Sequence, residues 1–428
     1  IQGDAVHPYL RRRSGQEPIT YPHPLVEPVL RRTLGVPLFQ EQLMQIASAV
    51  GGFSAADGDE LRRAIGSKRS RERMAELRDR LFEGMEGNGI VGELAESIWR
   101  RIEAFAGFGF AESHSLAFGK LVYASSWLKL HHPAAFLAGL LRAQPMGFWS
   151  GQTLSADARR HGVEVLGPDL VRSVAMADLE RSGERVGGDD ACLEPHQPVV
   201  PWEPGPNDHG RHRRDRGFAV RLGLSSVAHV GVDDAERIVA ARAQSPFAGI
   251  DDVARRARLD RRQLESLATA GAFESLGLER RQALWLAAPA STEREDQLEG
   301  TSVTVQPPLL PILSEAEQTA LDIWATGVSP DDHPVRHARA ALEASGVVPI
   351  ARLTELEPGR RRWAAGIVTH RQRPQTAQGV TFMNLEDETG MLNVVCSVGL
   401  WKRYRSVAKH SAALKVRGIL QHSQGVVT

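Results

Sequence analysis

One block in the first third of the chain constrains the fold most. Residues 107–141 (GFGFAESHSLAFGKLVYASSWLKLHHPAAFLAGLL) hold an apolar run, Leu116 to Leu141, that is interrupted at Pro133. Proline removes a backbone donor and ends a helix before it, so this pattern predicts two consecutive helices. A basic segment, LRRAIGSKRSRER at residues 61–73, precedes the block. Gly66 within it lets the backbone turn tightly and gathers several cations in one place.

Composition narrows the class of protein. The 428 residues suffice for about three domains, each with its own core. The 52 basic and 52 acidic residues balance, so any binding of nucleic acid must depend on local patches. Cys192 and Cys396 lie far apart and form no metal-binding spacing, so we expect neither disulfides nor structural zinc. There is no signal peptide and no apolar run of about 18 residues, which favours a cytoplasmic protein without a membrane partner.

Hydrophobic periodicity predicts a helical region over residues 1–172. Asp59 or Ser70 is a candidate cap for helices within it. A polar stretch rich in proline and glycine follows, and residues 173–217 are expected to be a linker. The helical periodicity is clearest where apolar residues recur on one face, at Leu43, Ile46, Ala47 and Val50.

The second half of the chain changes character twice. Residues 218–286 are expected to form short helices with tight turns, and residues 287–348 a mixed connector with a helix from about Glu315 to Trp324. Over residues 349–428 the alternation of apolar and polar side chains predicts antiparallel strands that curl into an incomplete β-barrel of the OB type. We therefore expect a multidomain α+β protein. The chain begins at Ile1 and ends after a strand pattern, so we expect it to be a fragment.

Two groups of residues are candidates for binding nucleic acid by their chemistry. The basic turn offers cations for a triphosphate or a DNA backbone, or it is a solvated helix face balanced by Glu60, Glu72 and Glu76. In the barrel, aromatic and cationic side chains suit single strands, and Phe382 alternates with Met383, so one of these two faces the core. The barrel candidates are Arg371, Arg373, Phe382, Trp401 and Lys402.

The segment Ser113-His114-Ser115 does not predict a hydrolase. No nucleophile elbow and no orienting acid lie near it in the sequence. We therefore expect no catalytic residue and no metal ligand in this chain.

Several segments together resemble the bacterial DNA polymerase III alpha subunit family. The opening HPYLRRRSGQEPITYPHPLVEPVLRRTLGVPLFQEQLMQIA resembles the junction of palm and fingers, over about residues 1–40, and the basic turn with the apolar helix pair resembles the fingers. Further segments resemble the error-prone branch of the family, which acts in damage tolerance: ESHSLAFGKLVYASSWLKLHHPAAF, QPMGFWSGQTLSADARRHGVEVLGPD, AVRLGLSSV and LDIWATGVSPDDHPV.

The resemblance implies a role for each region. By this resemblance, residues 1–172 are expected to be a fingers domain near the incoming nucleotide. Residues 349–428 are expected to be an OB fold that binds nucleic acid. Residues 218–286 resemble tandem helix-hairpin-helix motifs, whose backbone N–H groups bind DNA phosphates. His229 stands where the motif's first glycine is expected, so Val230 and Gly231 either contact DNA or are a structural relic. The implied contacts in the fingers are Arg62, Arg63, Lys68, Arg69, Ser113, His114 and Lys120.

In this family two Mg²⁺ ions held by palm aspartates support nucleotidyl transfer. Those aspartates would lie before Ile1, so we expect this chain to bind primer–template DNA and deoxynucleoside triphosphates without polymerising. Accessory translesion proteins, and through them the sliding clamp, are further expected partners. Three hypotheses remain: a portion of an error-prone polymerase, a stand-alone DNA-binding module, or a scaffold for repair proteins that docks them on residues 287–348.

Overall fold

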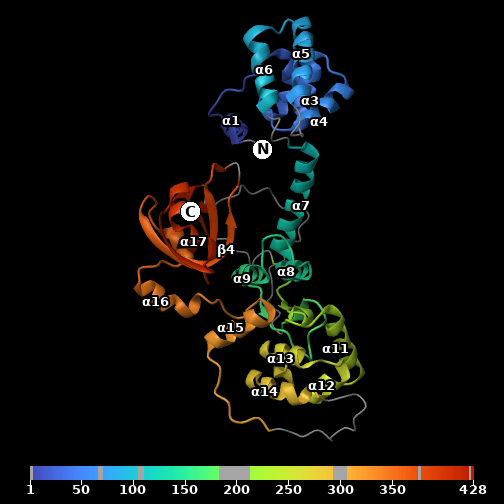
Figure 1. Ribbon diagram of the computed structural model, residues 1–428, viewed down its shortest axis with the longest axis vertical. Helices are drawn as coiled ribbons and strands as arrows, with labels where there is room; N and C mark the ends of the chain where they lie inside the picture. Colours follow the sequence, from blue (N-terminus) through green and yellow to red (C-terminus); the bar gives the residue numbers. More distant parts are fainter. Residues whose placement is uncertain are drawn as a thin grey trace. The chain divides into compact units, whose positions relative to one another are not determined.

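The computed structural model describes residues 3–65, 71–104, 110–182, 213–292, 306–374, 377–423 and 426–428. The chain divides into two compact units, Ile1–Ser125 and Ser126–Thr428, which we describe separately. The expected α+β class is confirmed, because helices precede and surround a curled antiparallel sheet near the C-terminus (Figure 1). Among the described residues, none of the helices combines the length and the apolar character that crossing a bilayer requires.

Unit one is helical throughout its described residues. Its core lies between α3, α5 and α6, and the predicted apolar face of α3 is buried there at Leu43, Ile46, Ala47 and Val50. Helices α3 and α5 approach so closely that a Cβ on Gly84 would lie 2.0 Å from the carbonyl oxygen of Gly51. The helices are α1 (Gly3–Arg13), α2 (Glu27–Leu30), α3 (Gln40–Gly51), α4 (Ala55–Ile65), α5 (Arg71–Gly87), α6 (Gly92–Ala104) and α7 (Glu112–His131), which crosses into unit two.

Buried polar groups fix the ends of these helices. The side chain of Gln42 is fully buried, accepts the N–H of Leu38 at 2.9 Å and donates to Thr33 Oγ1 at 2.8 Å, which holds the segment before α3 against it. The expectation that Asp59 caps a helix is wrong, because Asp59 lies inside α4. Ser54 precedes α4 instead, and its N–H donates to Asp57 Oδ2 at 2.9 Å. The alternative cap, Ser70, lies outside the described residues.

Unit two begins with two helices around a small sheet. Pro133 separates α7 from α8 (Pro133–Arg142) as predicted, and the carboxylate of Asp215 accepts the first free N–H groups of α8 from Ala134 at 2.8 Å and Ala135 at 3.1 Å. Helix α9 (Gly151–Arg160) follows. The sheet, which the sequence analysis did not anticipate, has the order β1-β3-β2 and takes β2 from the stretch expected as a linker. Its strands are β1 (Val165–Leu166), β2 (Asp178–Arg181) and β3 (Phe218–Arg221).

A helical cluster with its own core lies between this sheet and the C-terminal strands in sequence. Side chains from all four of its helices pack around Phe273, which is fully buried. Asp260 precedes the third helix and caps it, because its side chain accepts the N–H of Gln263 at 2.9 Å. The helices are α11 (Val232–Gln244), α12 (Ile250–Ala257), α13 (Arg261–Thr269) and α14 (Arg280–Ala290), and the connector adds α15 (Glu315–Thr326) and α16 (Arg339–Ala344).

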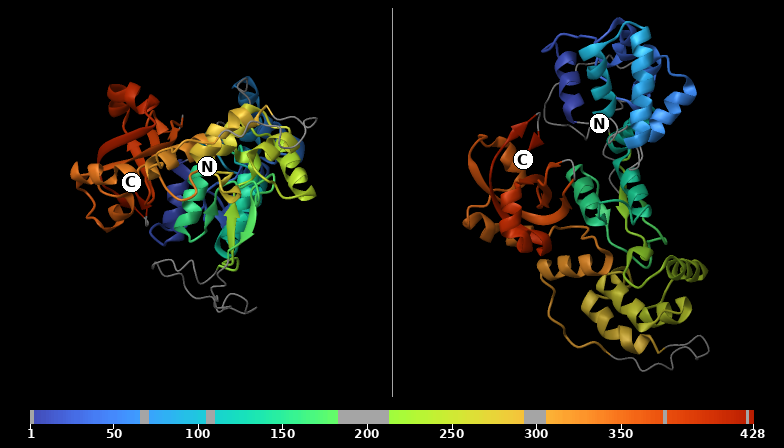
Figure 2. Two further views of the ribbon diagram at one scale, coloured as in Figure 1. Left: turned by 90° about the horizontal axis from the view of Figure 1, so that it is seen from below. Right: turned by 45° about the horizontal axis from the view of Figure 1, so that its top comes forward.

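The C-terminal sheet has the strand order β6-β5-β4-β7, all antiparallel, and it curls around one apolar face (Figure 2). That inner face buries Ala364, Met383, Leu385 and Leu392. The strands are β4 (Arg361–Gln372), β5 (Thr381–Glu386), β6 (Met391–Cys396) and β7 (Ala413–Ile419), with α17 (Val398–His410) between β6 and β7 and a short hairpin of β8 (His422–Ser423) and β9 (Val426–Val427) at the end.

A buried carboxylate joins α9 to this sheet. Glu386, at the end of β5, is 2% exposed and accepts a hydrogen bond from Thr153 Oγ1 at 2.8 Å, with Arg160 at 3.5 Å. Next to it Asp387, which is fully buried, pairs with Arg339 at 2.7 Å. Burial of a carboxylate is costly unless such partners are present, so the contacts of Glu386 specify how α9 lies on the sheet, and those of Asp387 how α16 does.

We predict that Glu386 makes the fold less stable as the pH rises. Burial raises the pKa of this carboxyl above its ordinary 4.5, so between the two values the folded chain holds a proton that the unfolded chain has lost. The unfolding free energy therefore falls as the pH rises through that window. Glu386→Gln keeps an oxygen for Thr153 but does not titrate, so the stability of the variant relative to the wild type should increase from pH 4.5 to pH 7 in urea denaturation.

The matched control is Glu357→Gln, at an exposed carboxylate that pairs with Arg360 at 2.9 Å. Its stability difference from the wild type should not change over the same pH range. Parallel stability curves for wild type and E386Q would contradict the assignment of the pH dependence to Glu386.

Candidate nucleic-acid interface

The basic turn of unit one presents two exposed arginines at the end of α4. Arg62 and Arg63 lie 2.7 and 2.8 Å from the two carboxylate oxygens of Asp59, with their side chains 46% and 71% exposed. The hydrogen bond from Arg62 and the charges of both guanidinium groups lower the pKa of Asp59. The two arginines thus share one carboxylate and remain exposed, while the other acids of α4, Asp57 and Glu60, pair with Arg80. The other two cations expected here, Lys68 and Arg69, lie outside the described residues.

Helix α7 carries the remaining candidates of the fingers. Ser113, His114 and Lys120 are all exposed on it, and the ring of His114 lies between those of Phe110 and Phe118, at centroid distances of 5.6 and 4.4 Å. The start of α7 is fixed within unit one. Glu112 accepts two hydrogen bonds from Arg32, and its own N–H donates to Glu41 Oε2 at 2.9 Å. The polar residues of α7 are therefore presented from a firmly held first turn.

The first hairpin keeps its backbone shape although it lacks a glycine. His229 adopts φ = +65°, the left-handed conformation that favours glycine, and its Nδ1 lies 3.0 Å from Ser266 Oγ. This contact stabilises a backbone conformation that costs an ordinary residue about 1–2 kcal/mol. The turn that precedes α11 therefore forms with histidine in place of glycine.

The same hairpin is poorly suited to a phosphate. The N–H of Gly231 donates to Asp234 Oδ2 at 2.9 Å, and this hydrogen bond lowers the pKa of Asp234, so its charge is maintained. With Asp233 it places two carboxylates on the first turn of α11, where an incoming anion would be repelled. Val230 is buried in the core. The geometry thus favours the structural alternative for Val230 and Gly231.

The barrel candidates separate into two residues that contact the rest of the domain and three that lie on its surface. Arg371 donates from Nε to the carbonyl of Ala408 at 2.7 Å and from a terminal nitrogen to that of Ser411, so it fastens the end of α17 to β4. Trp401 packs against the cluster of Met383, Cys396 and Ala408. Trp401 is therefore half-buried, whereas Arg371 stays exposed but is held by these carbonyl groups. Arg373 and Lys402 are exposed. Because Met383 is the residue in the core, Phe382 lies on the outer face of the sheet.

Phe382 lines a cavity that the sequence analysis did not identify. The volume is about 400 Å³, and aromatic side chains from the turn between α8 and α9 form its other wall. The sequence signal was the pair of aromatics in QPMGFWSGQ, which follow a glycine in an otherwise polar turn. The lining residues are Phe148, Trp149, His370, Gln372, Phe382, Asn384 and Asn393.

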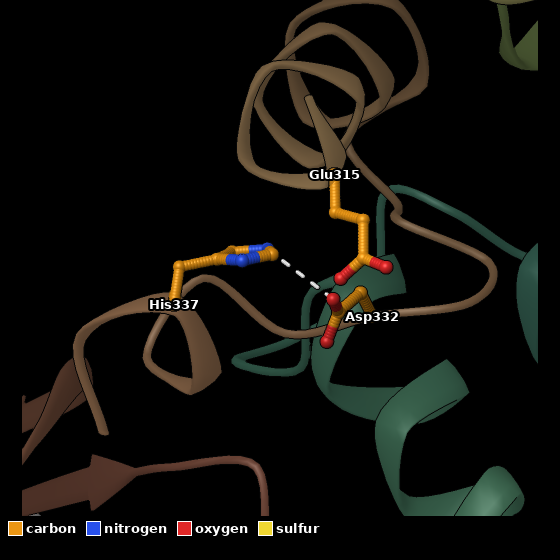
Figure 3. A group of neighbouring side chains, drawn as sticks. All are labelled: Glu315, Asp332 and His337. Atoms are coloured by element: carbon orange, nitrogen blue, oxygen red, sulfur yellow. Dashed lines mark ion pairs between the residues drawn. The ribbon is translucent and has the colours of Figure 1, made fainter. Parts of the chain in front are cut away.

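Among the described residues, one group has the donor set and spacing of a metal site. The ligand atoms of Glu315, Asp332 and His337 lie within 4.8 Å of one another, and Nε2 of His337 is 3.2 Å from Asp332 (Figure 3). Arg336 is also 3.3 Å from Asp332, and Thr319 Oγ1 is 3.0 Å from His337 Nε2. Mg²⁺ prefers oxygen ligands in octahedral geometry, so this mixed group, already paired with a cation, does not fit Mg²⁺.

Comparison with known families supplies the identity. Residues 1–89 match the family model of the bacterial DNA polymerase III alpha subunit finger domain, residues 162–283 match a helix-hairpin-helix motif, and residues 363–428 match an OB-fold nucleic acid binding domain. Curated proteins named error-prone DNA polymerase match the whole chain. That of Cutibacterium acnes is 55% identical, that of Mycolicibacterium paratuberculosis 52%, and one of Mycobacterium tuberculosis 50%.

The chain is similar at its N-terminal end to the finger domain of the bacterial DNA polymerase III alpha subunit family, and over its whole length to portions of error-prone DNA polymerases. It spans about two fifths of the length of these relatives: 39% of the Cutibacterium protein and 36% of the other two. The resemblance to the family and to its error-prone members is confirmed.

We predict that Arg371→Ala destabilises the C-terminal sheet more than it weakens binding of DNA. The variant leaves the carbonyl oxygens of Ala408 and Ser411 without their charged donor, which should lower the unfolding free energy by about 1–3 kcal/mol. Thermal unfolding followed by circular dichroism measures the effect. Lys402→Ala, at an exposed lysine on α17, is the control and should leave the midpoint unchanged. An unchanged midpoint for R371A would disprove the structural role.

Proposed function

We propose that this chain is the part of an error-prone DNA polymerase that holds primer–template DNA and the incoming deoxynucleoside triphosphate. One observation carries the proposal: models of fingers, helix-hairpin-helix and OB fold match in this order along a chain that is similar throughout to proteins named error-prone DNA polymerase. The residues that lie together in the structure suit this division of labour.

In the proposed mechanism, Arg62 and Arg63 neutralise the phosphates of the incoming nucleotide. Their guanidinium groups can exchange the shared carboxylate of Asp59 for phosphate oxygens, because both are exposed and a bidentate phosphate contact is stronger. His114, Ser113 and Lys120 offer polar contacts along α7. The outer face of the OB sheet, including Phe382, receives single-stranded template.

Mg²⁺, which would stabilise the attacking and leaving oxygens of nucleotidyl transfer, is proposed to bind palm carboxylates outside this chain. The carboxylate group described above does not fit it. Synthesis across damaged template, accessory translesion proteins, indirect contact with the sliding clamp and a cytoplasmic location are parts of the same proposal. The alternatives are a DNA-binding module without chemistry and a scaffold of a repair complex.

Binding of the chain to fluorescently labelled primer–template DNA tests the proposal. We expect binding at low salt that weakens steeply as salt increases, because cations of the chain replace counterions on the phosphates. Fluorescence anisotropy at several potassium chloride concentrations gives the slope. No binding at 20 mM salt would refute the proposal. Binding to DNA without extension by a longer protein that contains this chain and its upstream palm would favour the DNA-binding module.

We predict that Arg63→Ala, in a polymerase that contains this chain, raises the KM for nucleotide about tenfold, the loss expected for one charge-assisted phosphate contact. The Kd for primer–template should change less. Steady-state kinetics with a gapped primer–template and anisotropy measure the two quantities. Arg31→Ala is the matched control, because Arg31 is also exposed in unit one and pairs with Glu27 at 3.1 Å. An unchanged KM for R63A would remove Arg63 from the nucleotide site.

A further inference from the structure

The outer face of the C-terminal sheet is organised by strand pairing. Two cross-strand rows lie on it, one of His370, Asn384 and Asn393 and the other of Gln372, Phe382 and Val395. Alternation puts the neighbours of these residues in β5 and β6 on the inner face, where Met383, Leu385 and Leu392 are buried. The outer face is thus polar in one row and aromatic in the next.

A β-bulge determines that His370 belongs to this face. The pairing of β4 with β5 shifts between Val368 and His370, so Thr369 is an extra residue without an opposite partner. Such a bulge re-aims the side chains that follow it. Without it, Thr369 instead of His370 would lie beside Asn384, and the cavity would lose an aromatic side.

The turn that precedes α9 forms the opposite wall. The rings of Phe148 and Trp149 lie edge-on to His370, at centroid distances of 5.9 and 4.6 Å. Phe148 is 71% exposed, which is unusual for so large an apolar side chain beside a cavity. The hydrogen bond of Thr153 with Glu386 holds α9, and thereby this turn, against the sheet.

Apart from His370, the polar groups that line the cavity are side-chain amides. The side-chain amides of Asn384 and Asn393 face each other across β5 and β6, and each can both donate and accept. Within the described part of the chain, Nε2 of His370 is buried and has no hydrogen-bond partner. An isolated buried nitrogen of this kind costs free energy until a ligand supplies a partner. Among the described residues that line the cavity there is neither arginine nor lysine, so these residues offer no cation to hold a phosphate.

We propose that this cavity accepts a single unstacked nucleobase of the template strand. The ring would stack on Phe382 and on the Phe148–Trp149 turn, while the amides and His370 meet the hydrogen-bonding edge of the base. The volume of about 400 Å³ lies in the usual range for small-molecule pockets, about 300–1,000 Å³. This inference rests on the proposed function, since it presumes that the chain holds DNA, and it goes further by assigning a binding site to one base.

The same face of the sheet offers a path for the strand's backbone. Trp363 pairs with Arg417 across β4 and β7 on the outer face, with Lys415 Nζ 4.7 Å and Arg417 Cζ 5.7 Å from its ring centre. These cations lie outside the cavity, beside an aromatic surface. A single strand could therefore place phosphates near Lys415 and Arg417 and turn one base into the cavity.

The test uses the full chain and a primer–template with a single-stranded template overhang, whose junction fixes the position of each base. Each overhang nucleotide is replaced in turn by an abasic residue, and anisotropy gives the Kd. We expect one position at which the abasic residue weakens binding at least about fivefold, the lower end for a stacked base. In Phe148→Ala, intact DNA should bind more weakly by a similar factor, and the abasic penalty at that position should disappear.

The control variant is Trp285→Ala, at a half-exposed aromatic of α14 outside the cavity, which should leave the position-specific penalty unchanged. Circular dichroism verifies that F148A is folded, as the exposure of Phe148 implies. Equal affinity at every abasic position, with primer–template still bound, would overturn the base pocket and leave the proposed function intact. Failure to bind any DNA would overturn both.

The base of a free nucleotide could fill the cavity in the same way as a base of the template strand. A second experiment distinguishes these two ligands. Tryptophan fluorescence is titrated with dATP and dTTP up to 1 mM and with the primer–template, in the wild type and in Trp149→Phe. Quenching by the template that W149F loses, with none from free nucleotides, supports a strand base. Equal quenching by free nucleotides would overturn the assignment to the strand.

Discussion

The hydrogen bond from Thr153 to the buried carboxylate of Glu386 joins segments that lie 233 residues apart in the chain. Burying a carboxylate without partners would cost several kcal/mol, so the native arrangement of unit two is the one in which Thr153 and Arg160 reach Glu386. The adjacent pairing of Arg339 with the buried carboxylate of Asp387 likewise holds a helix, α16, against the sheet. The aromatic turn before α9, the outer face of the sheet and the cavity between them all depend on this join.

Most arginines in the described residues that sequence reasoning would assign to nucleic acid already have partners within the protein, although they are exposed. Arg371 satisfies carbonyl groups at the end of α17, and Arg62 and Arg63 share Asp59. A balanced total charge is consistent with this use of arginine. Affinity for DNA then depends on a few exposed cations and on aromatic surfaces, and less on overall electrostatic attraction.

Much of the fold follows from local patterns. The spacing of Leu43, Ile46, Ala47 and Val50 predicts the buried face of α3, and Pro133 predicts the break after α7, because both signals act within one helix turn. The strands of the C-terminal sheet follow from alternation in the same way. Helix α17 was missed, because its mixed polar sequence between two strands resembles a loop, and Trp401 was therefore assigned to a binding surface instead of the core.

The candidate site was less accessible to sequence reasoning, because it depends on contacts between distant segments. Nothing near Phe382 in the sequence indicates Phe148 or Trp149 as its neighbours. The small sheet of β1, β3 and β2 was missed for the same reason, since its strands are only two to four residues long and pair across a long separation. The residue that closes the first hairpin, Asp234, was not among the candidates, because its hydrogen bond with the N–H of Gly231 is visible only in three dimensions.

The bulge at Thr369 determines two roles of β4 at once: His370 lines the cavity, and Arg371 attaches α17. Strand positions alternate between faces, so the single extra residue decides that His370 points outward and Arg371 inward. The aromatic cavity and the attachment of α17 therefore depend on the same alternation of side chains along the strand. If Thr369 instead paired with Asn384 in a regular strand, His370 would turn inward and Arg371 outward, and the cavity wall and the attachment of α17 would be lost together.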